Sequence, residues 1–185
     1  MKYIVLEDEV SYDGHQISSL WAYENTGSLD DTIIAFRGPC GVSIEHMIDL
    51  EDRVSDESIE SPDMIHFICE HFDSTDLKLV YARQRLFVLI VSEILSRYGL
   101  VTERNGDDLF FNDRKLSVSI ASVSPVSQKF HFGMNIVHEH YASLKMAGIK
   151  EDDIYSLMDE ICDRYCMEFK DIERDLRKSR PLDVI

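Results

Sequence analysis

The fold prediction rests on residues 107–120, Asp-Asp-Leu-Phe-Phe-Asn-Asp-Arg-Lys-Leu-Ser-Val-Ser-Ile. Two runs rich in apolar residues, at 109–111 and 116–120, flank the polar pair Asn112-Asp113. Asn and Asp are common in tight turns because their short side chains hydrogen-bond the local backbone. The stretch therefore predicts a β-hairpin with Asn112 and Asp113 in its turn.

The residues around this hairpin extend the same pattern. Asn105-Gly106 is a strong tight-turn signal, and Pro125 interrupts the chain before the next apolar segment, so residues 100–137 are predicted to form consecutive strands. The segment 64–72 fits a strand or a short helix about equally by periodicity, and a strand is favoured. Further strands are expected at 2–6, 32–36 and 129–137, and helices at 15–23, 77–98 and 151–177.

These elements predict an α+β protein in which helices cover a mainly antiparallel sheet. No repeat and no low-complexity linker divides the sequence, so residues 1–185 are expected to form a single domain. One break is predicted directly after the strand at 32–36. Residues 37–41, Arg-Gly-Pro-Cys-Gly, should form a loop because proline cannot donate a ladder hydrogen bond.

The charge of the chain excludes several classes of partner. Its 185 residues include 35 Asp and Glu against 19 Lys and Arg, which gives a net charge of −16. Nucleic acid and anionic membrane surfaces are bound through clustered Lys and Arg, so neither is an expected partner. Residues 49–60 hold six of the carboxylates and are interpreted as a solvated acidic surface.

Other features of the sequence predict a cytoplasmic location. No apolar run approaches the roughly 20 residues that a membrane-spanning helix needs. The first residues turn acidic and offer no small-residue cleavage site of a secretory signal. The four cysteines contain no Cys-x-x-Cys pair and are expected to be free thiols, as in a reducing compartment.

Two segments resemble a known group of enzymes. The hairpin from Asp107 to Ser117 is similar to the central hairpin of biotin and lipoate protein ligases, and the segment 132–136, Phe-Gly-Met-Asn-Ile, is similar to the glycine-containing strand that follows it. The whole chain resembles an uncharacterised family, a domain of unknown function assigned to that fold. The resemblance implies an α+β architecture of the biotin/lipoate ligase type, related to class II aminoacyl-tRNA synthetases.

The resemblance also implies a site. Such ligases activate a carboxylic acid with ATP, and a fixed cation can stabilise the charge that develops at the phosphate. It implies that Lys115 is this catalytic residue and that ATP is a cofactor the site could take. The ligand-binding residues that it implies are Arg37, Gly38, Asp107, Asp108, Ser117, Gly133 and Asn135.

Several features of this sequence leave alternatives open. Arg37 lies where the ligases carry an arginine- and glycine-rich loop that grips the adenylate, but here Pro39 removes a backbone donor from this phosphate loop. Val118 stands where the ligases have glycine, so substrate identity does not carry over. Asp107 and Asp108 either contact a nucleotide or cap the turn. The leading hypothesis is a protein that binds or activates a small carboxylic acid as its adenylate. The rival is a non-catalytic small-molecule-binding or assembly module, and a homodimer is compatible with either.

The cysteines and histidines offer other chemistry, but most are expected to be buried. Cys40 could be a nucleophile but is expected to be a small buried residue. The run at 138–140, His-Glu-His, lacks the spacing of a helical zinc motif, so no metal site is predicted. His66 and His71 are expected to be partly buried strand residues. His131 is a better candidate for a pocket residue because it lies two positions before Gly133.

Overall fold

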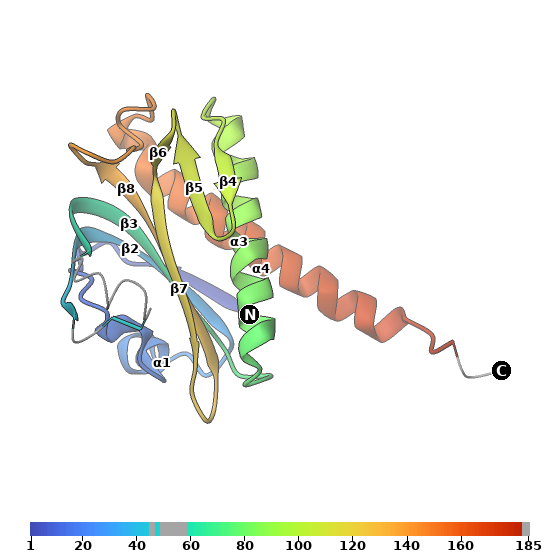
Figure 1. The fold of residues 1–185 in the computed structure, drawn as a ribbon. Coiled ribbons are helices and arrows are strands. Elements are labelled where there is room, and N and C mark those ends of the chain that lie inside the picture. The colour runs from blue at the N-terminus through green and yellow to red at the C-terminus, as the bar shows by residue number, and fades with distance from the viewer. Residues whose placement is uncertain (45–46, 49–58, 183–185) are drawn as a thin grey trace.

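The computed structural model describes residues 1–44, 47–48 and 59–182, so most of the acidic stretch 49–60 lies outside the described residues (Figure 1). Within the described chain, five strands form the main sheet in the order β1-β2-β3-β8-β7. Neighbouring strands are antiparallel except for the parallel pair β1 and β2. The mainly antiparallel sheet is therefore confirmed. The strands are β1 (Lys2–Val5), β2 (Thr32–Val42), β3 (Ile59–His71), β8 (Gln128–Val137) and β7 (Ser117–Val123).

The predicted hairpin is present and forms part of a second, smaller sheet. Its strands β5 (Asp108–Phe111) and β6 (Arg114–Lys115) pair antiparallel, and β4 (Glu103–Asn105) lies on the other side of β5. Asn112 and Asp113 both have positive φ, 51° and 61°, which is the left-handed conformation that two-residue hairpin turns favour. The chain then enters β7, so the hairpin delivers Lys115 to the edge of the main sheet.

Two long helices cover one face of the main sheet. They are α3 (Leu77–Arg97) and α4 (Ile154–Lys178), the latter entered through the 3₁₀ turn η3 (Glu151–Asp153) (Figure 1). The Asp76 carboxylate caps α3 by accepting from the backbone N–H of Leu79 at 2.7 Å. Phe87 of α3 packs edge-on against Phe132 of β8 and Tyr165 of α4. This aromatic contact ties both helices to the sheet.

The opposite face carries a thinner cover made from the N-terminal part of the chain. Ile34 and Phe36 of β2 belong to a second apolar cluster with Tyr12 and Trp21. The helix predicted at 15–23 is instead a 3₁₀ turn, η1 (His15–Ile17), followed by a short helix, α1 (Trp21–Thr26). The two are separated because Leu20 has φ 67°, and in this conformation its N–H donates to a buried carboxylate oxygen of Glu70.

The prediction of a loop at residues 37–41 is wrong, because β2 continues through these residues to Val42. Proline is tolerated because the pairing with β3 shifts register between Gly38 and Cys40, so Pro39 lies at an irregularity. The segment at residues 10–12 runs along the free side of this part of β2. The N–H of Val10 donates to the carbonyl of Arg37, and the N–H of Tyr12 donates to that of Pro39.

The last part of the chain leaves the body of the protein. From residue 170 to residue 182 every residue is exposed, and Figure 1 shows this end of α4 projecting away from the sheet. Neither this helix nor any other among the described residues combines the length and apolar character needed to cross a bilayer.

Candidate functional site

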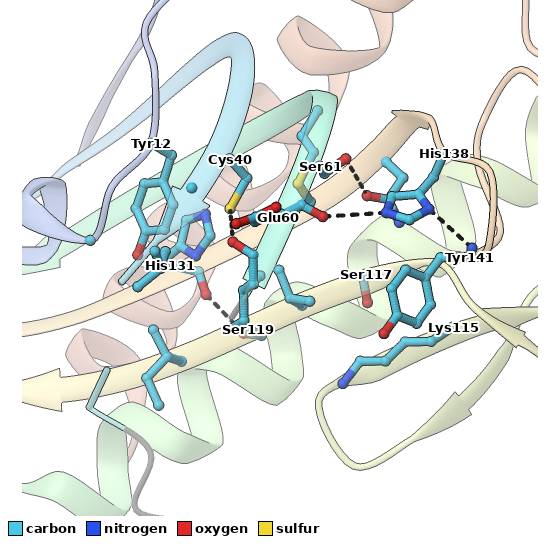
Figure 2. A pocket seen from close by; sticks show the side chains of 18 of the residues that line it. Tyr12, Cys40, Glu60, Ser61, Lys115, Ser117, Ser119, His131, His138 and Tyr141 are labelled. Atoms are coloured by element: carbon cyan, nitrogen blue, oxygen red, sulfur yellow. Dashed lines mark hydrogen bonds between the residues drawn. The ribbon is translucent and has the colours of Figure 1, made fainter. Parts of the chain in front are cut away.

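A cavity of about 830 Å³ lies on the face of the sheet opposite α3 and α4. Its floor is formed by side chains of β3, β7 and β8 that point away from the helices, among them Met64, Val118 and His131. Figure 2 shows Lys115 and Tyr141 toward one end of this cavity and Tyr12, Cys40 and His131 toward the other. The cavity is therefore elongated along β7, with a cation near one end.

Lys115 is the last residue of β6 and lines the cavity. Its backbone is held because Lys115 pairs with Phe110 in the hairpin and its carbonyl accepts from the N–H of Ala142. The side chain is 39% exposed, and Nζ lies 2.8 Å from a carboxylate oxygen of Asp108. The structure therefore brings together Lys115 and Asp108, with Asp108 as the ion-pair partner of the lysine.

Three other predicted residues lie at or beside the cavity. Ser117 lines it and accepts the backbone N–H of Leu109 at 2.8 Å. Asn135 also lines it, but Oδ1 accepts from Ser61 and Nδ2 donates to the carbonyl of Ala142, so its amide fastens the wall. Gly133 is not itself a lining residue, but it lies between His131 and Asn135 along β8, on the same face of the strand.

Glycine at position 133 leaves room for the floor side chains. A Cβ there would come within 2.9 Å of Met64 Cε and 3.2 Å of His131 Cε1. Contacts that short would force at least one of the two side chains to move. Gly133 therefore sets where His131 lies.

Arg37 lies away from the cavity. Side chains alternate between the two faces along a strand, so Arg37 is on the same face of β2 as Ile33 and Ala35. Those two residues pack in the core under the helices, so the side chain of Arg37 is on the helix-covered face. Its guanidinium makes two hydrogen bonds to the Asp63 carboxylate, at 2.9 and 2.6 Å, and an ion pair with Glu151. The hydrogen bonds with Asp63 raise the pKa of Arg37. Arg37 fastens the sheet to the start of α4.

Gly38 and Asp107 are also separated from the cavity. A Cβ at Gly38 would lie 2.2 Å from the carbonyl oxygen of Val10, so glycine is needed for the close approach of the two chains. The Asp107 carboxylate accepts from Gln84 of α3 at 2.9 Å and forms an ion pair with Arg85 at 3.5 Å. Gly38 therefore allows β2 to pack against the segment at Val10, and Asp107 links the start of the hairpin to α3.

His131 lines the cavity, as expected, and His66 is fully buried, but the sequence did not reveal that the two residues pair. His66 Nδ1 lies 3.1 Å from His131 Nε2, and His66 Nε2 lies 3.2 Å from the carbonyl oxygen of Gly38. The ring of Tyr12 stacks on that of His131 with centroids 3.7 Å apart. Burial lowers the pKa of His66 to about 4, and burial also lowers the pKa of His131 well below its usual value. Both imidazoles are therefore neutral at pH 7.

Cys40 lines the same end of the cavity but is 5% exposed. Burial raises the pKa of its thiol to about 12. A thiol with so high a pKa is protonated at neutral pH and is a poor nucleophile. The expectation that Cys40 is a small buried residue fits this environment.

His138, which also lines the cavity, uses both of its ring nitrogens in contacts with the backbone. His138 Nδ1 accepts from the N–H groups of His140 and Tyr141, at 3.0 and 3.2 Å. Its other ring nitrogen, Nε2, lies 3.3 Å from the carbonyl oxygen of Glu60. Both nitrogens of His138 are thus used to shape the turn after β8.

A separate group of possible metal ligands lies at the end of β3 near α4. Atoms of Asp31, His71 and Asp73 lie within 4.8 Å of one another. The Asp73 carboxylate, however, is paired in bidentate fashion with Arg83 at 2.7 and 2.6 Å, and Asp31 accepts from the N–H of Phe72 at 2.9 Å. The guanidinium of Arg83 supplies the positive charge at this cluster, which explains the group as a set of structural ion pairs.

Comparisons with known proteins identify close relatives. A model of the family described as Domain of unknown function (DUF366) matches residues 1–180. An uncharacterized protein of Methanocaldococcus jannaschii is 41% identical over 189 residues, which cover 98% of this chain and 86% of that protein. The solved structure of a protein of unknown function from Pyrococcus horikoshi is 36% identical, with a TM-score of 0.89 and 98% of each chain covered.

More distant structures show what the fold is similar to. Biotin protein ligase from Aquifex aeolicus, in complex with biotin and ATP, has a TM-score of 0.59 at 13% identity, with 96% of this chain and 73% of that chain covered. A proposed lipoate protein ligase from T. acidophilum, with bound lipoic acid, has a TM-score of 0.56 at 13% identity and covers 90% of this chain and 86% of its own. This confirms the fold expected from the hairpin. The chain therefore belongs to the DUF366 family, a domain of unknown function with the biotin/lipoate protein ligase fold.

Proposed function

We propose that the protein binds a small carboxylic acid in the cavity, with the carboxylate held by Lys115. The observation that carries the proposal is the position of this cation at one end of an elongated, largely apolar cavity (Figure 2). A buried or half-buried ammonium forms its strongest hydrogen bonds with carboxylate or phosphate oxygens. The ion pair with Asp108 keeps Nζ in place, and an incoming carboxylate would share the ammonium with it.

The size and lining of the cavity suit a ligand with an apolar body. About 830 Å³ falls within the range of roughly 300 to 1,000 Å³ found for small-molecule sites. Ile17, Met64 and Ile120 are among the residues that supply its apolar surface. The fold neighbours described above hold biotin and lipoic acid, which are carboxylic acids of this kind, and this likeness supports the class of ligand.

We propose binding without activation by ATP as the function that the geometry supports best. Gripping a nucleotide phosphate requires a cluster of fixed positive charges or backbone donors. Arg37, the residue implied for this role, is paired with Asp63 and Glu151 on the other face of the sheet. Pro39 and the continuous strand β2 take the place of a phosphate loop. These observations favour the non-catalytic binding module over adenylate formation.

Replacing Lys115 with alanine is expected to weaken binding of small carboxylic acids by about 10- to 100-fold. A hydrogen bond to a charged group contributes about 1.5–3 kcal/mol, and each 1.4 kcal/mol is a factor of ten in affinity. Isothermal titration of the wild type and Lys115→Ala with octanoate, lipoate and biotin measures the effect. Equal affinities in the two proteins would show that Lys115 does not hold the carboxylate.

The matched control is Lys78→Ala, which removes an exposed lysine of α3 that does not line the cavity. This variant is expected to bind as the wild type does. A second arm repeats the wild-type titration with ATP and Mg²⁺ and measures release of pyrophosphate, the product that leaves when a carboxylate forms an adenylate. No pyrophosphate and no change in affinity are expected, and release of pyrophosphate on addition of an acid would restore the activation hypothesis.

We further propose a cytoplasmic protein whose partner is a small molecule and not nucleic acid or membrane. The four cysteines are all unpaired, which supports a reducing compartment. The net charge of −16 disfavours association with polyanions. A homodimer stays a prediction, which size-exclusion chromatography with light scattering would decide.

A further inference from the structure

The end of the cavity opposite Lys115 is polar in a specific way. In the pairing of β7 with β8, His131 lies beside Ile120, five residues beyond Lys115. Ile120 lies three residues beyond Ser117, the first residue of β7, which is about 10 Å along the strand at about 3.3 Å per residue, and Lys115 lies two residues before Ser117. His131 lines the cavity although it is only 2% exposed, and Tyr12, 4% exposed, lines it next to His131.

The hydrogen bonds of the two buried histidines determine which nitrogens carry protons. The carbonyl oxygen of Gly38 can only accept, so His66 Nε2, 3.2 Å away, must donate to it. A neutral His66 then has a lone pair on Nδ1, and His131 Nε2 must donate to that lone pair at 3.1 Å. The neutral His131 is left with a lone pair on Nδ1. The pair thus fixes His131 as an acceptor at that atom.

The acceptor has no partner of its own. Within the described part of the chain, no residue hydrogen-bonds to His131 Nδ1 or to the Tyr12 hydroxyl, although both side chains are more than nine-tenths buried. Among the described residues, Gln128 Nε2 is the only fully buried side-chain nitrogen or oxygen without a partner, so His131 Nδ1 and the Tyr12 hydroxyl are not sealed off in the protein interior. Both side chains line the cavity, so a group inside the cavity is the partner that the geometry allows.

We propose that the His131 end of the cavity recognises a hydrogen-bond donor, an N–H or O–H group, on the ligand. This inference rests on the proposed function for the other end of the ligand, where Lys115 holds the carboxylate. It narrows the ligand class to carboxylic acids that carry a donor group at the far end of an apolar body. His131 is a specificity residue, and His66 positions its proton.

The first test compares three acids that differ only at the far end. Titration of the wild type with 8-hydroxyoctanoate, 8-methoxyoctanoate and octanoate is expected to give about tenfold tighter binding of the hydroxy acid than of the methoxy acid, the value of one buried hydrogen bond. The ether oxygen can accept but not donate, so the comparison isolates the donor. Equal binding of the two acids would overturn the proposal and leave the carboxylate site at Lys115 intact.

The His131→Phe variant tests whether His131 causes the preference for the hydroxy acid. Phenylalanine keeps the stacking surface against Tyr12 but removes the acceptor. The variant is expected to bind the hydroxy acid and the methoxy acid equally, so the ratio of the two affinities falls from about ten to about one. His15→Gln, at an exposed histidine outside the cavity, is the matched control and should retain the wild-type ratio. A preference that survives in His131→Phe would place the donor contact elsewhere and overturn the assignment.

A second measurement needs no variant and no carboxylate. In ¹⁵N-labelled wild-type protein, NMR distinguishes protonated from unprotonated ring nitrogens, and His131 is expected to carry its proton on Nε2. Adding 1-hexanol should shift the Nδ1 resonance, whereas its methyl ether should not. A proton on Nδ1, or equal responses to the alcohol and the ether, would contradict the proposal even if no acid binds. Failure of all acids with a response to hexanol would instead count against the role of Lys115 alone.

Discussion

Acidification from pH 6.5 to pH 4 is expected to lower the free energy of unfolding by about 3 kcal/mol through His66 alone. Burial lowers the pKa of this imidazole from 6.5 to about 4 in the folded protein. Between pH 6.5 and pH 4, His66 is therefore protonated in the unfolded chain but mostly neutral in the folded protein. Each pH unit between the two pKa values changes stability by about 1.4 kcal/mol. The stabilisation is complete above pH 6.5 and is lost as the pH falls toward 4.

The surroundings of the histidine pair compensate only in part. Its ring neighbours are Tyr12 and Phe36, and burial outweighs the hydrogen bond to the Gly38 carbonyl, which raises the pKa of His66. Burial lowers the pKa of His131 as well, and a protonated His66 would repel a second proton there. Because the two rings are coupled, they titrate as a pair. His131 therefore adds to the acid sensitivity and does not offset it.

Urea unfolding at pH 7, 6, 5 and 4.5 measures this dependence. His66→Phe is expected to be less stable at pH 7, because it leaves the Gly38 carbonyl without its donor, but to show a slope smaller by about 1.4 kcal/mol per pH unit. His15→Gln, which removes an exposed histidine, should keep the wild-type slope. Equal slopes for His66→Phe and wild type would show that His66 does not carry the acid sensitivity. Lowered carboxyl pKa values, as at Asp31 and Asp73, act below about pH 4 and so outside this window.

The parts of the fold that were predicted correctly have local causes. The hairpin could be predicted because Asn112 and Asp113 are suited to the positive φ that its turn requires. The long helices could be predicted from apolar spacing and from Gly99, which has φ 83° two residues after the end of α3. The position of Lys115, the last residue of β6, depends on the same local structure.

The parts that were missed depend on contacts between distant segments. Residues 37–41 are held in β2 by hydrogen bonds from the segment at 10–12. The sequence around 37–41 does not show that this distant segment pairs with it. The alternation along β2 then sends Arg37 to the helix-covered face. Tyr12 has no motif around it that marks a pocket residue, and the partnership of His66 with His131 joins positions 65 residues apart. Only the sheet register brings them together.

Gly38→Ala is expected to lower the free energy of unfolding by about 3 kcal/mol. The added Cβ would lie 2.2 Å from the carbonyl oxygen and 2.8 Å from the carbonyl carbon of Val10. Both are backbone atoms, so no side chain can rotate to relieve the contact, and overpacking of this kind costs about 1–3 kcal/mol or more. The strand β2 and the segment at 10–12 must separate. Thermal and urea unfolding measure the loss.

The same strand supplies the control and links this prediction to the cavity. Gly41→Ala places a Cβ in open space without a positive φ, so it is expected to be neutral or slightly stabilising. In Gly38→Ala, moving the segment at 10–12 carries Tyr12 away from its stack on His131, so affinity at that end of the cavity should fall with stability. If Gly38→Ala were as stable as Gly41→Ala, the close approach of Val10 to β2 would not be a feature of the protein in solution. The wall that positions Tyr12 would then need another explanation.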